Sequence, residues 1–173
     1  MLTLVYGGSG SGKSVYAEEI AVKCSGPRYY IATMEPFGKA AQDRIRKHRR
    51  QRSDKGFQTF ECYTGLDSLR LPERGTVLLE CMGNLTANEL FSPKGAGKDA
   101  FTQMKTGLES LLEQSNDLIV VSNDVFREGT DYQEETLEYL KVLGELNRFL
   151  AQKAERVAEV VCGIPLAVKG ELL

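Results

Sequence analysis

The 173-residue sequence lacks a long apolar run, a closely spaced cysteine pair and a large excess of either charge. No apolar run approaches the roughly 20 residues that a membrane-spanning helix needs, so we expect no membrane span. The mostly apolar residues 1–6 are too few for the core of a signal peptide, and they run into glycines as a β-strand would. We therefore expect neither a targeting segment nor a membrane anchor.

The four cysteines have no CxxC spacing, which counts against a disulfide framework and against a zinc site. Each lies within or beside an apolar stretch, so we expect all four to be buried, reduced thiols. Reduced thiols predict a cytoplasmic location. The residues are Cys24, Cys62, Cys81 and Cys162.

The charges nearly cancel, because 22 basic residues stand against 24 acidic ones and give a net charge of −2. Such a surface is not built as a whole to hold nucleic acid, so we expect no nucleic-acid partner. The local exception is RIRKHRRQR at residues 44–52, where six basic side chains surround the only histidine. A nucleic-acid-binding module remains an alternative, although between Tyr30 and Phe57 only Phe37 offers a ring for base stacking.

Short apolar runs alternate with longer segments in which apolar residues recur every three or four positions. This alternation predicts a three-layer α/β fold, in which helices cover both faces of a mostly parallel central sheet. At this length, residues 1–173 are expected to form a single domain. Strands are predicted at residues 2–6, 28–33, 57–62, 76–81, 117–123 and 157–163, and a surface loop at residues 92–100.

The segment GGSGSGKS at residues 7–14 fits the phosphate-binding pattern G-x-x-x-x-G-K-[ST]. Glycines let backbone N–H groups point at phosphate oxygens, and the following helix adds the partial positive charge of its N-terminus. A flexible glycine-serine turn is the alternative, but the motif lies between a predicted strand and a helical pattern, as a P-loop requires. We predict a RecA-like P-loop NTPase fold and nucleotide binding by Gly7, Gly8, Ser9, Gly10, Ser11, Gly12, Lys13 and Ser14.

A P-loop is completed by a carboxylate that holds Mg²⁺ through water at the end of a neighbouring strand. Glu80 follows three apolar residues near the end of the predicted strand 76–81 and is the first candidate. Asp124, directly after strand 117–123, is the second. Because ligands of open α/β sheets bind at the carboxyl ends of strands, a functional role for Glu80 is favoured over that of a solvated or helix-capping acid.

Residues 38–52 have a helical pattern in which Ala41, Ile45 and His48 share one face, so His48 is expected to look toward the protein body. A lone histidine on an apolar face is more often a packing residue, and a run of arginines is more often a solvated face. Beside a P-loop, however, a neutral imidazole can attack the α-phosphorus of a nucleotide while guanidinium groups neutralise phosphate charge. From the residues alone, both interpretations stay open.

The order of these motifs resembles that of the bifunctional adenosylcobinamide kinase / adenosylcobinamide-phosphate guanylyltransferase family of cobalamin biosynthesis. The P-loop alone is generic, whereas a lone histidine in the frame Arg-Ile-x-x-His-x-x-x-Arg, followed by Leu-Leu-Glu-Cys, is far more specific. The resemblance runs over nearly the full length, through LVYGGSGSGKSVYAEEIA, YYIATM, RIRKHRRQR, FQTFEC, LLECMGNLTANELF, VSNDV and VAEVVCGIP.

This resemblance implies two reactions. GTP or ATP phosphorylates a hydroxyl of adenosylcobinamide or a related corrinoid, and GTP guanylylates a histidine that passes GMP to adenosylcobinamide phosphate. The resemblance also implies a homotrimer. It assigns catalysis to His48 and Lys13, the nucleotide site to Thr33, Arg49, Arg52 and Glu61 beside the P-loop, and Mg²⁺ to Ser14 and Glu80. For Glu61 a physical reason exists, because a carboxylate can accept the N1–H and N2–H of guanine together.

One further enzyme remains as an alternative, a P-loop kinase for another small alcohol in which His48 is merely structural. The sequence departs from the family pattern at Gly83, where the family often has threonine. It departs again at FREGTDY, residues 126–132, which replaces a glycine-rich turn. These differences concern the corrinoid side of the site or the subunit contacts and leave the phosphate loop intact.

Overall fold

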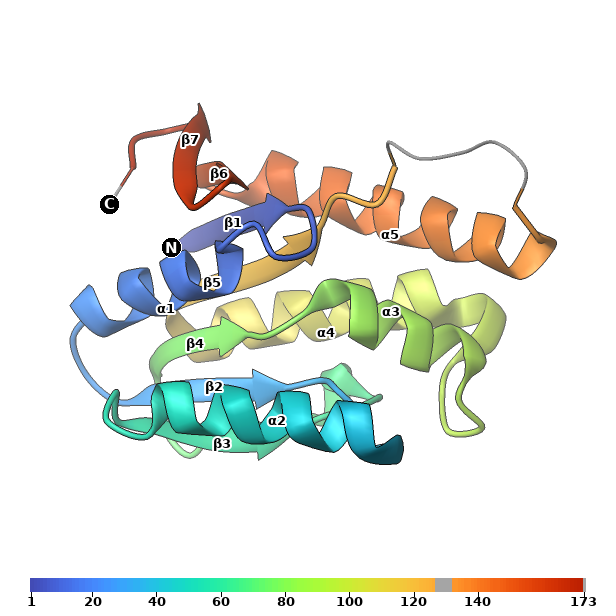
Figure 1. Ribbon diagram of the computed structural model, residues 1–173, viewed down its shortest axis with the longest axis horizontal. Helices are drawn as coiled ribbons and strands as arrows, with labels where there is room; N and C mark the ends of the chain where they lie inside the picture. Colours follow the sequence, from blue (N-terminus) through green and yellow to red (C-terminus); the bar gives the residue numbers. More distant parts are fainter. Residues whose placement is uncertain (127–131, 173) are drawn as a thin grey trace.

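A computed structural model describes residues 1–126 and 132–172, with the side chains of Ala40, Arg44 and Gln51 left aside. At its centre is a seven-stranded sheet with the order β3-β2-β4-β5-β1-β6-β7, and helices lie on both faces (Figure 1). Strands β1 to β6 are parallel to one another, and β7 alone among the described strands is antiparallel. The predicted three-layer α/β fold with a mostly parallel sheet is confirmed.

The six predicted strands are all present, and each differs from its predicted bounds by at most two residues at either end. The strands are β1 Leu2–Gly7, β2 Arg28–Ala32, β3 Phe57–Glu61, β4 Gly75–Leu79, β5 Ser115–Asn123, β6 Arg156–Val161 and β7 Ile164–Lys169. The helices are α1 Lys13–Lys23, α2 Gly38–Arg52, α3 Met82–Phe91, α4 Ala100–Gln114 and α5 Glu134–Lys153, with short 3₁₀ helices at Leu66–Ser68 and Gly97–Asp99.

The two faces of the sheet carry separate apolar clusters. Helices α1 and α2 lie over one face, where Val5, Leu78 and Ile119 belong to the smaller cluster. Helices α3, α4 and α5 lie over the other face, against a larger cluster that includes Leu79 and Met104. Neighbouring residues of β4 thus contribute to opposite cores, because successive side chains of a strand point to opposite faces. In the described part of the chain, no helix combines the length and the apolar character needed to cross a membrane.

Strand β7 is the one described strand that the sequence patterns did not predict. The strand expected at residues 157–163 ends at Val161, because Cys162 and Gly163 form a turn with φ angles of 50° and 80°. Two successive positive φ angles are typical of a type I′ hairpin turn, whose twist matches that of the strands it joins. The apolar side chains of β7 are 62, 48 and 57% exposed at Ile164, Leu166 and Val168. Exposed apolar residues of this kind do not give the pattern of a half-buried strand.

Two smaller expectations are met only in part. Cys162 is exposed because it lies in this hairpin turn, and Cys24 and Cys81 are only partly buried, so Cys62 is the one cysteine in the core. All four thiols are free. The predicted loop 92–100 includes a 3₁₀ turn, and its last residue is buried at the start of α4. Residues 127–131, most of the second departure from the family pattern, lie outside the described residues.

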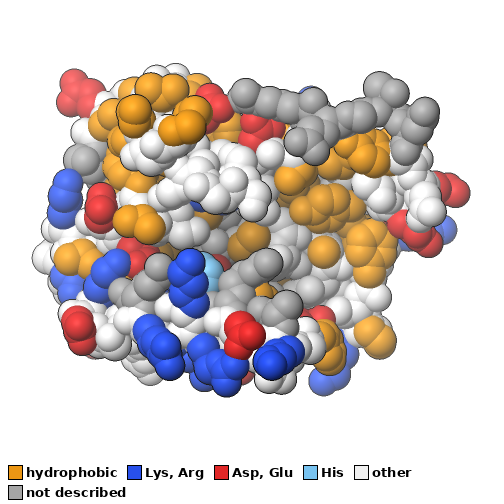
Figure 2. Space-filling view, in the orientation of Figure 1, with side chains coloured by type: hydrophobic (Ala, Val, Ile, Leu, Met, Phe, Trp, Pro, Cys, Tyr) orange, Lys and Arg blue, Asp and Glu red, His pale blue; other side chains and the backbone are white. Residues whose placement is uncertain are grey.

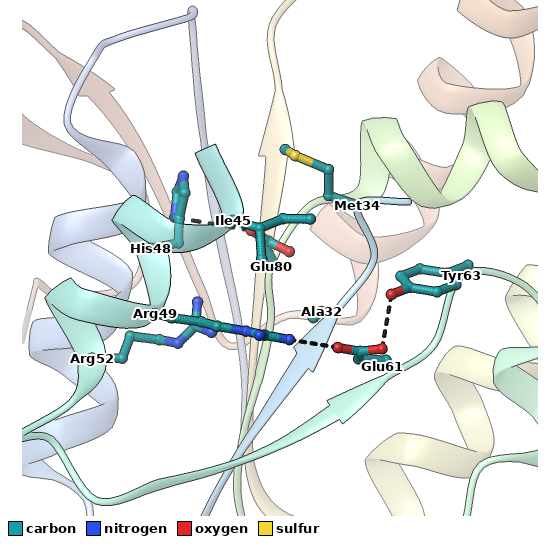
Figure 3. Close-up of a pocket in the computed structure, with 9 residues that line it drawn as sticks. All are labelled: Ala32, Met34, Ile45, His48, Arg49, Arg52, Glu61, Tyr63 and Glu80. Atoms are coloured by element: carbon teal, nitrogen blue, oxygen red, sulfur yellow. Dashed lines mark hydrogen bonds and ion pairs between the residues drawn. The ribbon is translucent and has the colours of Figure 1, made fainter. Parts of the chain in front are cut away.

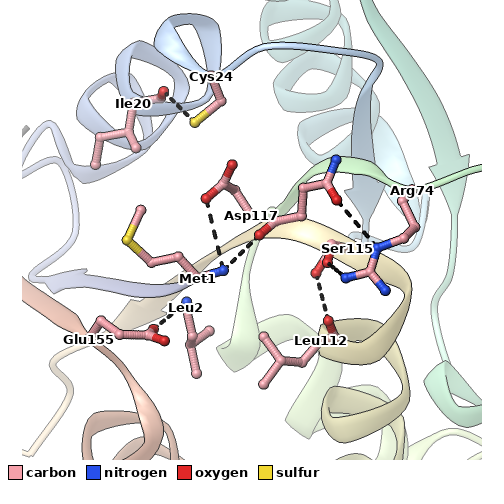
Figure 4. A network of polar contacts seen from close by, with 10 residues as sticks. Met1, Leu2, Ile20, Cys24, Arg74, Leu112, Ser115, Asp117 and Glu155 are labelled. Carbon is pink, nitrogen blue, oxygen red and sulfur yellow. Dashed lines mark hydrogen bonds and ion pairs between the residues drawn. The ribbon is translucent and has the colours of Figure 1, made fainter.

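At the amino-terminal ends of the strands, Arg74 joins β4 to α4 and β5 (Figure 4). Its guanidinium donates to the carbonyl oxygens of Glu113 and Ser115, each at 2.8 Å, and to the side-chain oxygen of Asn116 at 3.3 Å. The carbonyl groups in the last turn of a helix have no partners within the helix. Arg74 therefore caps α4 and fixes it to the start of β5.

We predict that Arg74→Ala lowers the free energy of unfolding by about 1–2 kcal/mol, because hydrogen bonds from a charged donor contribute more than neutral ones. Urea unfolding followed by circular dichroism measures this change. The matched control is Arg70→Ala, since Arg70 donates only to carbonyl groups of its own turn. A change within about 0.5 kcal/mol is expected for the control. Equal losses in the two variants would show that Arg74 does not cap α4.

Candidate active site

The phosphate-binding loop joins the end of β1 to the start of α1. Gly12 has a φ of 92° where the helix begins, a conformation that glycine adopts without steric cost. Gly7 approaches β6 so closely that a Cβ atom there would lie 2.5 Å from the carbonyl oxygen of Val160. The carbonyl oxygen of Ser11 accepts a hydrogen bond of 2.8 Å from the N–H of Gly163. The β6–β7 hairpin therefore supports the loop.

Lys13 is the first residue of α1, and its ammonium group donates to the carbonyl oxygen of Gly8 at 2.9 Å. Burial lowers the pKa of Lys13, while the nearby Cys81 acts in the opposite direction. The ammonium group is folded over the loop, where the N–H groups of the loop and the helix N-terminus attract an anion. A phosphate bound there would take the lysine from Gly8.

The loop borders an open groove of about 510 Å³ at the carboxyl ends of the parallel strands. Ligands of open α/β sheets bind at this edge. The groove brings together the predicted loop residues from Ser9 to Ser14, His48 of α2 and Glu80 after β4. Further lining residues, which the sequence did not single out for this site, are Val15, Met34, Lys47, Cys81, Asn84, Val121, Asn123 and Val125.

Glu80 is a nearly buried carboxylate between β4 and α2. Its Oε2 accepts a hydrogen bond of 3.2 Å from the backbone N–H of Thr33. Its Oε1 lies 3.9 Å from Nδ1 of His48 (Figure 3). The exposed fractions of the two side chains are 8% for Glu80 and 21% for His48. The expectation that His48 looks toward the protein body is confirmed, because a buried acid lies beneath its ring.

A second cavity, of only about 20 Å³, lies beside the groove between α2 and the ends of β2, β3 and β4 (Figure 3). The carboxylate of Glu61 accepts hydrogen bonds of 2.7 Å from Arg49 and 2.9 Å from Tyr63. Burial and the hydrogen bond to Glu61 raise the pKa of Tyr63 to about 12, so the phenol remains a donor at neutral pH. This space holds about one water molecule. Glu61 also lines a larger open cavity of about 600 Å³, together with Tyr63 and Cys62, so its carboxylate is accessible from that side while Arg49 and Tyr63 donate to it.

Arg52 lines the small cavity and not the groove. Its guanidinium carbon lies 3.3 Å from the centre of the Tyr30 ring, and the residue is 6% exposed. A desolvated cation over an aromatic face is attracted by the ring quadrupole. Arg52 is therefore held in place by the sheet, and it contributes a fixed positive charge to the cavity that Glu61 and Glu80 also line.

Thr33 is fully buried and lines neither cavity. Its hydroxyl donates to the carbonyl oxygen of Cys81 at 3.0 Å, and its own carbonyl oxygen accepts a 2.9 Å hydrogen bond from the Asn88 amide. Together with the hydrogen bond from its N–H to Glu80, these contacts join the ends of β2 and β4. Thr33 is therefore placed to hold the Glu80 carboxylate in position.

Some of the remaining basic side chains near His48 lie in solvent, and one lines the groove. Figure 2 shows Lys and Arg side chains gathered over the region of α2. Arg46 and Arg50 are exposed, and Arg46 pairs with Asp43 on the same helix. Lys47 is also exposed but lines the P-loop groove together with His48. One part of the basic stretch is thus a solvated face, and another faces the phosphate loop.

Oxygen ligands suited to Mg²⁺ are present in the groove. Ser14 and Glu80 both line it, whereas Asp124 lines two neighbouring cavities instead. Among the described residues, no group of three His, Cys, Asp or Glu side chains could hold a metal ion by itself. This composition fits Mg²⁺, which keeps several waters and binds through one or two protein oxygens together with substrate phosphates.

Sequence reasoning missed the polar contacts at the ends of β4 and β5. The Cys81 sulfur caps α3 by accepting from the N–H of Asn84 at 3.4 Å, and it also accepts from the Asn123 amide at 3.5 Å. Gly83 permits this packing, because a Cβ there would lie 2.5 Å from the Asn123 amide nitrogen and 2.9 Å from the Tyr139 hydroxyl. The rule that ligands bind at the carboxyl ends of strands would have pointed to Cys81 and Asn123.

The loop between β1 and α1, with Lys13 above it and Glu80 in the same groove, defines a P-loop nucleotide-binding α/β protein. Comparison with known proteins narrows this class. The family model described as "Cobinamide kinase / cobinamide phosphate guanyltransferase" matches residues 3–168. The chain therefore belongs to this family of enzymes, and the resemblance seen in the sequence is confirmed.

Curated relatives match over their full length. The "Bifunctional adenosylcobalamin biosynthesis protein CobP" of Pseudomonas aeruginosa is 31% identical over 175 residues, and the match covers 100% of both chains. The "Bifunctional adenosylcobalamin biosynthesis protein CobU" of Escherichia coli is 30% identical over 184 residues, covering 98% of this chain and 100% of the relative. The protein of the same name from Salmonella typhimurium is 28% identical over 185 residues with the same coverage.

We predict that Lys13→Gln raises the dissociation constant for GTP by roughly 10- to 100-fold, because a hydrogen bond from a charged donor contributes about 1.5–3 kcal/mol. Isothermal titration calorimetry measures this constant. The control is Lys23→Gln at the exposed end of the same helix, which should bind GTP as the unmodified protein does. Unchanged binding by Lys13→Gln would exclude the lysine from the phosphate site.

Proposed function

We propose that this chain catalyses both reactions of its family within one site. It transfers a phosphoryl group from a nucleoside triphosphate to adenosylcobinamide, and it transfers GMP from GTP to adenosylcobinamide phosphate. The observation that carries the proposal is the position of His48, which lines the same groove as Lys13 and the phosphate loop. A kinase needs no histidine there, so this position favours the bifunctional enzyme over a kinase alone.

In the kinase reaction, the loop from Gly7 to Ser14 holds the triphosphate through its backbone N–H groups. Lys13 leaves the Gly8 carbonyl and binds the β- and γ-phosphate oxygens. The acceptor hydroxyl attacks the γ-phosphorus as the bond to the β-phosphate oxygen breaks, which releases the nucleoside diphosphate and a proton. Mg²⁺ would be held by the Ser14 hydroxyl and, through water, by Glu80, and it would neutralise charge on the phosphates. Both residues line the groove, which supports this assignment.

In the guanylyl transfer, the imidazole of His48 attacks the α-phosphorus of GTP. A P–N bond forms as the bond to the pyrophosphate oxygen breaks, and Lys13 and Lys47 neutralise the charge that develops on pyrophosphate. The phosphate of adenosylcobinamide phosphate then attacks the same phosphorus and releases the imidazole. The two lysines line the groove together with His48, which supports these roles.

Guanine is proposed to bind at Glu61, whose carboxylate accepts the N1–H and N2–H of the base. In the free protein these acceptor positions are taken by Arg49 and Tyr63. Guanine thus replaces the donors of Arg49 with donors of its own, while Arg52 stays stacked on Tyr30 at the rear of the cavity. Adenine has an acceptor at N1 and cannot make the same exchange.

We also propose that residues 1–173 act as one domain and assemble as a homotrimer in the cytoplasm. The continuous seven-stranded sheet supports a single domain. The exposed apolar side chains of β7, at Ile164, Leu166 and Val168, support an assembly that covers them, since uncovered apolar edge strands favour aggregation. The free thiols support a reducing compartment.

Intact-protein mass spectrometry after incubation with GTP and Mg²⁺ tests the covalent intermediate. We predict a mass gain of one GMP, and its loss when adenosylcobinamide phosphate is added. His48→Asn should show no gain, and because His48 is the only histidine, no other imidazole can substitute for it. A GMP adduct on His48→Asn, or none on the unmodified protein, would disprove the guanylyl-histidine step.

Guanine recognition is tested with Glu61→Gln. Inosine lacks the N2 amino group, so the unmodified protein should form the adduct faster with GTP than with ITP. In Glu61→Gln, adduct formation from GTP is expected to fall by roughly 10- to 100-fold and the preference for GTP to disappear, because charge-assisted hydrogen bonds are lost. Glu73→Gln, at an exposed residue before β4, is the control. A preference that survives in Glu61→Gln would place the base elsewhere.

A further inference from the structure

We propose that Glu80 is a positioning residue for His48: it holds the imidazole proton on Nδ1, so that Nε2 carries the free electron pair that attacks phosphorus. The proposal deepens, and rests on, the guanylyl transfer proposed above. It gives Glu80 a task in the nucleotide-free protein that is separate from its contribution to Mg²⁺ binding.

The first observation concerns the two nitrogens of the ring. Nδ1 of His48 is buried and has no hydrogen-bond partner among the described side chains, and Oε1 of Glu80 lies 3.9 Å from it. The other ring nitrogen points away from Glu80 (Figure 3), and the residue lines the P-loop groove. A buried polar nitrogen without a partner is costly, and a small rotation of either side chain would bring Nδ1–H into hydrogen-bond range of the carboxylate.

The second observation is that Glu80 is held by hydrogen bonds from the sheet. Oε2 of Glu80 is bound by the N–H of Thr33, and the backbone N–H of Glu80 donates to the carbonyl oxygen of Ile31 at 3.0 Å. Thr33 is itself held by Cys81 and Asn88. Oε1 is therefore presented toward α2 from a rigid base, as a group that orients a catalytic side chain must be.

The third step concerns the chemistry of the imidazole. A neutral imidazole in water prefers to carry its proton on Nε2, which would leave the groove-facing nitrogen without a free electron pair. A carboxylate beside Nδ1 reverses this preference, as the aspartate of a Ser-His-Asp triad does for its histidine. In the reaction, the Nε2 electron pair forms the P–N bond, and the electrons of the broken P–O bond leave with pyrophosphate. The proton stays on Nδ1, and the resulting guanylyl-imidazolium cation is paired with the Glu80 anion.

Because the chain contains a single histidine, its tautomer can be measured directly. The experiment is a long-range proton–nitrogen correlation spectrum of isotope-labelled full-length protein, recorded without nucleotide or Mg²⁺ at a pH where the imidazole is neutral. We expect the proton on Nδ1 in the unmodified protein and a shift toward Nε2 in Glu80→Gln, which retains an acceptor for the Thr33 N–H. Glu61→Gln, the other carboxylate at the small cavity, is the matched control and should keep the proton on Nδ1.

A second readout separates positioning from metal binding. In Glu80→Gln the rate of GMP-adduct formation should fall at least tenfold and at most about 10⁴-fold, the loss that a wrong histidine tautomer causes in a catalytic triad. The Mg²⁺ concentration at half-maximal rate is expected to rise, because Glu80 also contributes to Mg²⁺ binding, but saturating Mg²⁺ should not restore the rate. Excess Mg²⁺ restoring the rate of Glu80→Gln would overturn the proposal, as would a proton on Nε2 in the unmodified protein. The spectrum contains no nucleotide, so failure of guanylyl transfer itself would appear separately, as an absent adduct with the proton still on Nδ1.

Discussion

The hydrogen bond between the Thr33 N–H and the Glu80 carboxylate is the contact on which the geometry of the site depends. It joins the ends of β2 and β4, two neighbouring strands of the parallel sheet. A carboxylate that is 8% exposed is costly unless its oxygens find donors. The backbone of Thr33 supplies one donor, and His48 of α2 lies 3.9 Å from the other oxygen. The acid that faces α2 is therefore held by the sheet.

The site combines a wide groove with a narrow cavity. The groove is open, and the loop that borders it has positive φ angles at Gly10 and Gly12. The small cavity at Glu61 is narrowed by an ion pair between two largely exposed side chains, Arg49 and Glu61. Such a pair contributes only about 0–1 kcal/mol, so opening the cavity costs little. In the proposed binding of guanine at Glu61, the N–H donors of the base would replace those of Arg49 and offset this cost.

The parts of the fold that the sequence predicted are those with a local cause. The glycines of the P-loop, the apolar runs of the inner strands and the spacing of Ile45 and His48 each specify a local conformation, and each prediction of structure was correct. The unpredicted parts depend on contacts between distant segments. β7 has no buried face of its own, and Cys162 is exposed only because the chain turns there. That Arg52 stacks on Tyr30, and that Glu61 is already occupied by Arg49, follows from tertiary packing that no spacing encodes.

The hydrogen bond between Gly163 and Ser11 has a consequence for how the protein is organised. The P-loop is usually regarded as a self-contained strand–loop–helix motif, yet here its backbone is fastened to a hairpin from the other end of the chain. The close approach of Gly7 to Val160 reinforces this dependence. The phosphate loop is therefore not a portable module. Its shape is complete only after the last strands have folded, so nucleotide binding reports on the integrity of the whole sheet.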